Sequence, residues 1–136
     1  MKQIFDTDTI LFQTLKNDST IASQLTGGVY IRQRPDNSVK EDIVVNTIAL
    51  SQEYAPQIGT SNINIHVADK TVNIGGVQQK VADLVRLKTL SGLVLDKIRT
   101  VVVQGLTMSI EPQNLIKEDE ISQHYANIRI SWNIHQ

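Results

Sequence analysis

The sequence contains no cysteine. A disulfide framework, a thiolate zinc site and a cysteine nucleophile are therefore all excluded. Aromatic residues make up only 4% of the chain, which is too few for the stacking surface of a typical single-strand binder. The net charge of -1 gives neither a basic field for nucleic acid nor the acidic excess of a DNA mimic. We therefore expect no sequence-specific recognition of nucleic acid.

Long hydrophobic runs are also missing. The most aliphatic segment, residues 84–103, is interrupted by charged side chains such as Arg86 and Asp96, which would be costly inside a bilayer. After Lys2 the chain continues as a charged and polar mixture, without the apolar stretch of a signal peptide. We expect a protein that is made and folds in a cytoplasm, without a membrane span.

What is present is typical of an ordered globular chain. The 136 residues are 40% hydrophobic and 20% charged, so there is enough apolar material to offset the entropy of ordering. This length fits a single core and leaves little room for a second one. The sequence predicts one domain that spans residues 1–136.

Strands are predicted most clearly by alternation of polar and apolar residues. Residues 126–135 place Ile128, Ile130 and Trp132 on one face and polar side chains on the other. Residues 61–67 and 106–111 alternate in the same way, and residues 29–34 form a strand that Pro35 ends. These patterns predict a sheet with one face in a core and one in water.

Helical spacing appears at two places, residues 8–25 and residues 77–102. The first is expected as two short pieces, and the second as one long helix. Loops or turns are expected at residues 52–60, 68–71, 73–76 and 112–122. The order of elements predicts an α+β fold: a mostly antiparallel β-sheet with one long helix and a short N-terminal helical segment packed on it.

Residues able to run chemistry do not form a recognisable set. His66 and His135 could join Asp69 or Glu111 in a metal site only if their strands were neighbours, and no compact zinc-enzyme spacing is present. The acidic run Glu118 to Glu120 is expected as a solvated loop. No serine lies in a nucleophile motif, and Gly75-Gly76 lacks the companions of a phosphate-binding loop. We expect no catalytic, cofactor-binding or metal-binding residues.

One strand suggests a contact surface instead. Residues 42–50 are apolar on both faces, so this strand is expected to be central and covered on both sides. Helices would supply one cover, and either a partner subunit or a loop of the same chain would supply the other. The candidate subunit interface consists of Val44, Ile48, Leu50, Tyr54, Gln57 and Ile58.

The layout of the whole chain resembles a known family. A helical start with Leu15 and Leu25 leads into Gly27-Gly28-Val29-Tyr30 and then Arg34-Pro35. The strand from Glu41 to Thr47, a long helix and the closing Ala126-Asn127-Ile128-Arg129-Ile130 follow. In this order the chain resembles the tail-completion or tail-terminator proteins of long-tailed phages and prophages.

The resemblance implies a structural virion protein without enzyme activity. It implies a homo-oligomeric ring, usually a hexamer, at the head-proximal end of the tail tube, in contact with the tail tube protein and the head-neck connector proteins. Assembly would take place in the host bacterial cytoplasm, and the protein would then reside in the tail or neck of the virion. Two alternatives stay open: a head-tail adaptor or minor tail subunit of similar fold, and a small metal-dependent enzyme that uses His66 and His135.

Overall fold

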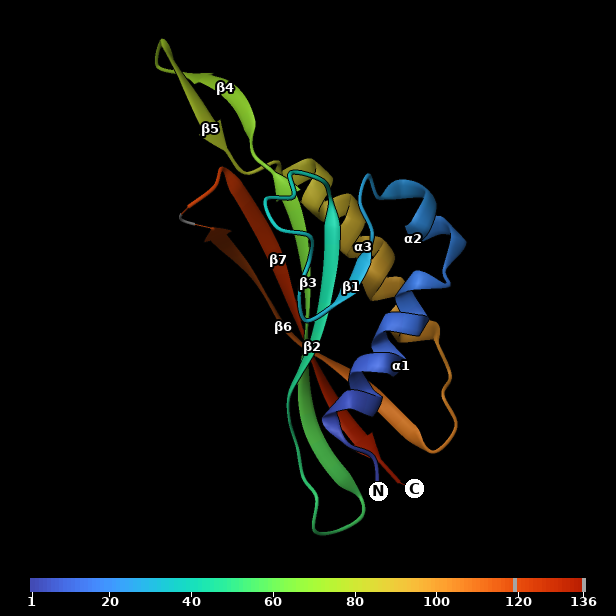
Figure 1. Cartoon of the computed structure of the whole chain (residues 1–136). Helices are drawn as coiled ribbons and strands as arrows, with labels where there is room; N and C mark the ends of the chain where they lie inside the picture. The colour runs from blue at the N-terminus through green and yellow to red at the C-terminus, as the bar shows by residue number, and fades with distance from the viewer. Residues whose placement is uncertain (119, 136) are drawn as a thin grey trace.

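The computed structural model describes residues 1–118 and 120–135 as an elongated body with one projecting hairpin (Figure 1). Its helices are α1 (Ile4–Lys16), α2 (Ser19–Gln24) and α3 (Leu84–Thr100). Its strands are β1 (Val29–Ile31), β2 (Asp42–Leu50), β3 (Gln57–Ala68), β4 (Lys70–Ile74), β5 (Val77–Val81), β6 (Leu106–Glu118) and β7 (Gln123–Ile134).

Five strands form the main sheet in the order β1-β2-β3-β7-β6. Strand β1 is parallel to β2, and the other three pairings are antiparallel. Helices α1 and α3 pack on one face of this sheet (Figure 1). The predicted α+β class is therefore confirmed, including the long helix and the short N-terminal helix.

The core lies between the helices and this face of the sheet. Alternate residues of β3 and β7 point into it, and Ile63, Ile65, Ile128 and Ile130 are fully buried there. Strand periodicity of two produces this pattern, because successive side chains point to opposite faces. From α1 and α3 come Leu11, Leu15, Leu87, Leu90, Val94 and Ile98.

The predicted helix over residues 77–102 was too long, because its first part is strand β5. Gly75 and Gly76 have φ values of +59° and +87° and form the two-residue turn that joins β4 to β5. Such a turn needs positive φ at both central positions, which glycine adopts at little cost. Helix α3 begins only after Asp83, whose side chain accepts a hydrogen bond from the Arg86 N–H.

Three predicted loops were also partly wrong, and of the turn expected over residues 68–71 only Asp69 lies outside β3 and β4. Strand β6 does not end before Pro112 but runs to Glu118, because β6 lies at the sheet edge and a register shift between Ile110 and Gln113 accommodates the proline. Strand β3 begins at Gln57, inside the loop expected over residues 52–60.

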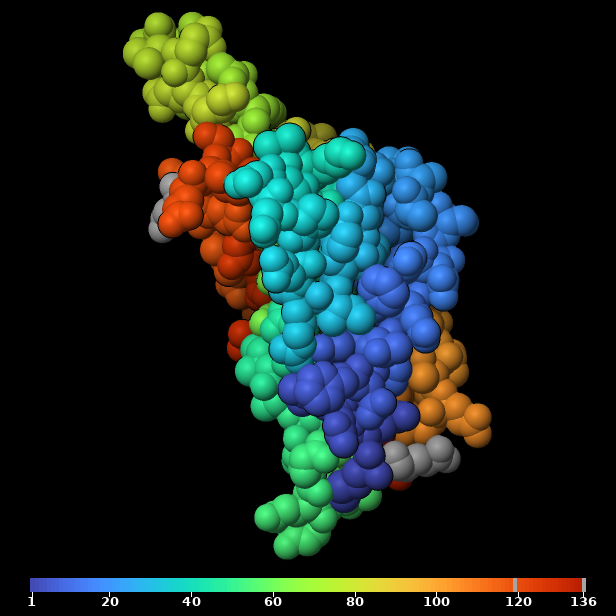
Figure 2. All heavy atoms as spheres, viewed as in Figure 1, coloured from blue at the N-terminus to red at the C-terminus, as the bar shows by residue number. Residues whose placement is uncertain are grey.

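The opposite face of the sheet is only partly covered. Residues 32–41, which we call the strap, leave β1 and lie against this face before β2 begins (Figure 2). The β4–β5 hairpin, residues 70–81, is called the arm and projects beyond the body. Among the described residues, no helix is both long enough and apolar enough to cross a membrane.

Gly27 tests the close packing where β1 meets β2. A Cβ added there would lie 1.9 Å from Asp42 Oδ1 and 2.6 Å from the Glu41 carbonyl oxygen. We expect Gly27→Ala to lower the free energy of unfolding by about 1–3 kcal/mol, as overpacking usually does. The measurement is urea denaturation.

Gly92→Ala is the matched control, because a Cβ at this helical position meets no atom within 4 Å. It should stabilise the protein by up to about 1 kcal/mol through helix propensity. Equal stability of Gly27→Ala and the wild type would show that the close approach to Asp42 is not present.

Candidate functional site: the strap and the exposed surfaces

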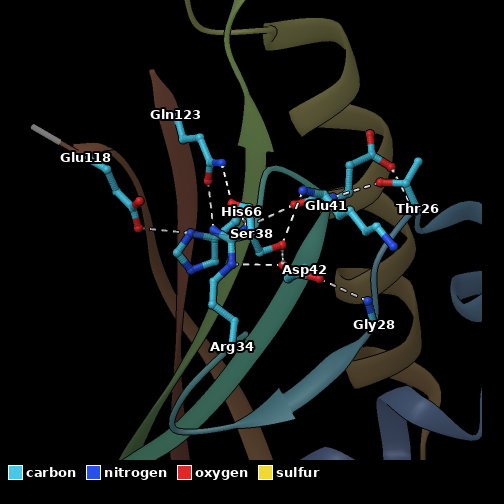
Figure 3. Close-up of polar contacts among 10 residues, drawn as sticks. Thr26, Gly28, Arg34, Ser38, Glu41, Asp42, His66, Glu118 and Gln123 are labelled. Carbon is cyan, nitrogen blue, oxygen red and sulfur yellow. Dashed lines mark hydrogen bonds and ion pairs between the residues drawn. The ribbon is translucent and has the colours of Figure 1, made fainter. Parts of the chain in front are cut away.

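Arg34 fastens the strap to the sheet. Its Nε donates to Asp42 Oδ2 at 2.8 Å, and its Nη1 donates to Gln123 Oε1 at 2.8 Å (Figure 3). Its Nη2 donates to the backbone carbonyls of Ser38 and Lys40. One guanidinium thus joins the strap to the start of β2 and the start of β7, and every bond involves a charged donor.

Asp42 receives bonds from three directions and is only 1% exposed. Besides Arg34, the Ser38 hydroxyl donates to its Oδ2 at 2.6 Å, and the Gly28 N–H donates to its Oδ1 at 3.1 Å. A buried carboxylate is tolerated only when it is paired and hydrogen-bonded, and this one is both. Asp42 therefore connects the turn before β1, the strap and the sheet.

A second buried carboxylate lies on α1. Asp8 Oδ2 accepts from Arg32 Nε at 2.7 Å, and its Oδ1 accepts from the Thr47 N–H at 2.6 Å. Arg32 itself has a φ of +65°, where the chain turns from β1 into the strap. Arg32 and Arg34 are thus both engaged in internal ion pairs.

The strap and the sheet enclose an open hollow of about 640 Å³. Its walls include Asn46, Asn64, His66, Tyr125, Glu118 and strap residues. The mixture of amides, paired arginines and acids is polar without a free cation cluster. The described residues contain no group of three or more acids and histidines that could hold a metal ion.

His66 is the titratable group most affected by this surrounding. Burial lowers the pKa of His66 to about 4, with a further contribution from the Arg34 charge that Asp42 partly opposes. Its Nδ1 lies 3.1 Å from Glu118 Oε1 but outside hydrogen-bond geometry, and its ring lies 4.9 Å from the Tyr125 ring. At neutral pH this imidazole is uncharged, and it acts as a packing group against Tyr125.

The histidines do not meet. His66 pairs with Tyr125 near the start of β7, whereas His135 follows the opposite end of that strand. His124 instead bonds Asp69 through Nδ1 at 2.6 Å. The convergence of His66 and His135 that a metal-dependent enzyme would need is therefore absent from the structure. Of the acidic run, Glu118 ends β6, and Asp119 lies outside the described residues.

The six candidate interface residues are divided by the structure. Val44 is covered where it lines the hollow beside the strap, so the loop of the same chain provides the second cover of β2. Leu50 joins the main core, because a register shift after Thr47 turns it toward the helices. Gln57 is 1% exposed and bonds the backbone of Lys2 and Ser51.

Three of the six remain at the surface, namely Ile48, Tyr54 and Ile58, with exposed fractions of 52%, 75% and 60%. We call these three residues the distal patch. They lie at the end of the sheet where the β2–β3 loop turns, opposite to the arm (Figure 1).

Sequence reasoning missed the Arg34–Asp42–Gln123 network. The sequence places Arg34 at the end of a predicted strand, and Gln123 falls between the predicted loop over residues 112–122 and the predicted strand over residues 126–135. The contact joins residues 89 positions apart, so no local pattern reveals it. One signal in the sequence could have revealed part of the network. Asp42 stands at the start of a strand that is predicted to be buried, and a buried carboxylate needs a positively charged or hydrogen-bonding partner.

Of the comparisons with known proteins, the one with solved structures finds a match, and that match concerns the fold. The chain matches no protein-family model and no curated protein sequence. Among solved structures, it is similar to a chain from the structure described as "Virion of native gene transfer agent (GTA) particle", with a TM-score of 0.64. The match covers 95% of this chain and 94% of that one at 12% identity, so it shows a shared fold.

The buried His66 predicts a pH dependence of stability. Its pKa is about 4 in the folded protein and 6.5 when exposed, so the unfolded chain binds the proton more readily between these values. The contribution of neutral His66 is complete above pH 6.5 and is lost progressively as the pH falls toward 4. We expect the difference in unfolding free energy between wild type and His66→Gln to change across this window.

His135→Gln is the control, since His135 is exposed. Both variants are compared with the wild type in urea titrations over the same pH range. A constant difference for His66→Gln would contradict the assignment of a buried neutral imidazole.

Proposed function

We propose that this protein is a structural virion subunit of a phage or prophage and acts as a tail terminator or tail-completion protein. In this role, residues 1–136 form one tail-terminator-like domain. Copies assemble into a ring of six at the head-proximal end of the tail tube and join it to the head and neck. The function requires surfaces for contact and no catalysis.

The observation that carries this proposal is the fold likeness to a virion chain over nearly the full length of both chains. The layout of the sequence resembles the tail-terminator family independently of that comparison. The site supports the same conclusion, because the polar groups beneath the strap are used to hold the chain together. Arg32, Arg34, Asp8 and Asp42 all have internal partners.

We assign the distal patch to the contact with the tail tube or neck. Exposed large aliphatic and aromatic residues that cluster at one end of a small body are typical of interfaces with other proteins. The opposite end carries the arm, so the two ends of the body have different surfaces. A subunit that lies between a tail tube and a head contacts a different partner at each end, so its two ends need different surfaces.

Ring formation and tube binding can be measured together. At high concentration the purified protein should form a closed assembly with a mass near six chains, seen as rings by negative-stain electron microscopy. Tail tubes should bind it at one end only. A strict monomer that binds neither tail tubes nor neck proteins would contradict the proposal, and binding to a head connector alone would favour an adaptor.

The distal patch can be tested with Ile48→Asp and Ile58→Asp. We expect each to weaken binding to tail tubes or neck proteins at least about tenfold, because a charge would be buried at the contact. Val39→Asp is the matched control, since Val39 is an exposed aliphatic residue of the strap. Unchanged binding by both patch variants, with unfolding free energies like the wild type, would remove the patch from the interface.

A further inference from the structure

The arm has two unlike faces. Its register pairs Ile74 with Val77, Val72 with Gln79 and, next to the body, Lys70 with Val81, so that these side chains share one face. The other face carries Asn73 opposite Gln78 and Thr71 opposite Lys80. Ile74 and Val77, next to the turn, are 48% and 58% exposed. The apolar face of the arm is therefore open to solvent.

This hairpin receives little support from its own chain. Strands β4 and β5 contact chiefly each other, and they stand clear of the body (Figures 1 and 2). An isolated two-stranded hairpin is marginally stable in water, and it becomes stable when a further strand or a helix packs on it. The amphipathic arm thus lacks the layer that would bury its apolar side.

Of the two edges of the main sheet, the one formed by β6 also lacks a neighbouring layer. Strand β6 is last in the strand order and pairs only with β7, so its second edge has no strand partner in the described chain. Such an edge offers unpaired backbone groups for a further strand. Its outer part also exposes Leu115 and Ile116, at 51% and 37%.

An apolar groove of about 500 Å³ adjoins this edge, between α3 and β6. Its lining includes Leu84, Leu87, Leu95 and Leu115, and the absence of a side chain on Gly92 leaves its floor open.

Charge favours a second copy as the occupant. The arm carries Lys70 and Lys80 and no acidic residue. On β6 and the turn that follows it, Glu111, Glu118 and Glu120 outnumber the single Lys117, although Glu118 and Glu120 also line the hollow under the strap. In the described chain, the one charged residue in the groove lining is Lys88 of α3. The basic arm is thus complementary in sign to the β6 strand, and its apolar side chains are complementary in polarity to the leucines of the groove.

We propose that the arm of one copy docks on the β6 edge and the α3–β6 groove of the next copy. This inference rests on the proposed ring and names the contact that builds it. The arm projects away from its own β6, so the interaction is between molecules. Because the two surfaces differ, the contact is heterologous, and repetition of such a contact builds either a closed ring or an open filament, of which the proposed function requires the ring.

The arm is tested with the double variant Ile74→Asp/Val77→Asp, which places two charges on its apolar face. The β6 edge is tested with Glu111→Lys/Leu115→Lys, which opposes the lysines of the arm. Each should reduce self-association at least about tenfold by analytical ultracentrifugation. Asn73→Asp/Gln78→Asp adds the same charge to the polar face of the arm and should leave assembly nearly unchanged.

Mixing the two defective variants gives the sharper result. The arm variant keeps an intact edge and the edge variant keeps an intact arm, so an equal mixture should form a dimer of one of each and nothing larger. A symmetric contact, in which the same surface meets itself, would not produce this heterodimer.

The outcomes separate the inference from the function on which it rests. Rings formed normally by the arm variant or by the edge variant would overturn the docking inference and leave the ring proposal intact. A wild-type chain that stays monomeric at all concentrations and binds no tail would overturn both. Circular dichroism of each variant shows whether the body stays folded, as expected for changes at exposed positions.

Discussion

The structure depends on the buried carboxylate of Asp42 and the partners that surround it. Three donors from two segments converge on this side chain: the Gly28 N–H from the turn before β1, and the Ser38 hydroxyl and the Arg34 guanidinium from the strap. Because an unpaired buried charge would be strongly destabilising, the turn before β1 and the strap must stay close to the start of β2. Nearby, Glu41 forms a two-point ion pair with Arg86, which attaches α3 to the same corner.

The contacts around Asp42 and Glu41 hold the strap and α3 against the sheet, and the remaining uncovered surfaces are available to other proteins. The helices bury one face of the sheet, and the strap covers part of the other. Most large apolar side chains in the middle of the body are therefore buried. The surfaces that keep exposed apolar side chains or an unpaired strand edge lie at the two ends of the body and at one edge of the sheet. These are the distal patch, the arm and the open side of β6. The centre of the body is held by buried ion pairs, and exposed apolar surface remains at its two ends and at the β6 edge. This distribution suits a subunit that assembles with copies of itself.

The sequence predicted the elements whose side chains divide between core and water. The alternation at Ile128, Ile130 and Trp132 predicted β7, because one face of this strand packs in the core and the other does not. Prediction failed over residues 77–81, where Val77 and Val81 are four residues apart and fit helical spacing as well as a strand. Only the Gly75-Gly76 turn and the Asp83 cap distinguish the two, and both act through backbone geometry.

The candidate interface was predicted only in part for a similar reason. The cover of Val44 comes from the strap, which is held by a contact across the chain to Gln123, and the burial of Leu50 follows from a local register shift. Neither leaves a periodic signal. Ile48, Tyr54 and Ile58 were predictable as exposed apolar residues, because the loop near them contains turn residues and no further cover.

A crosslinking experiment measures the proposed contact directly, and the absence of native cysteine makes it clean. Ile74→Cys is placed on one chain and Leu115→Cys on another, and the two are mixed with a short bifunctional maleimide. The account predicts efficient crosslinks between the two variants and few within either variant alone. Crosslinking confined to pairs of Ile74→Cys chains, or none between the two variants under conditions where rings form, would contradict it.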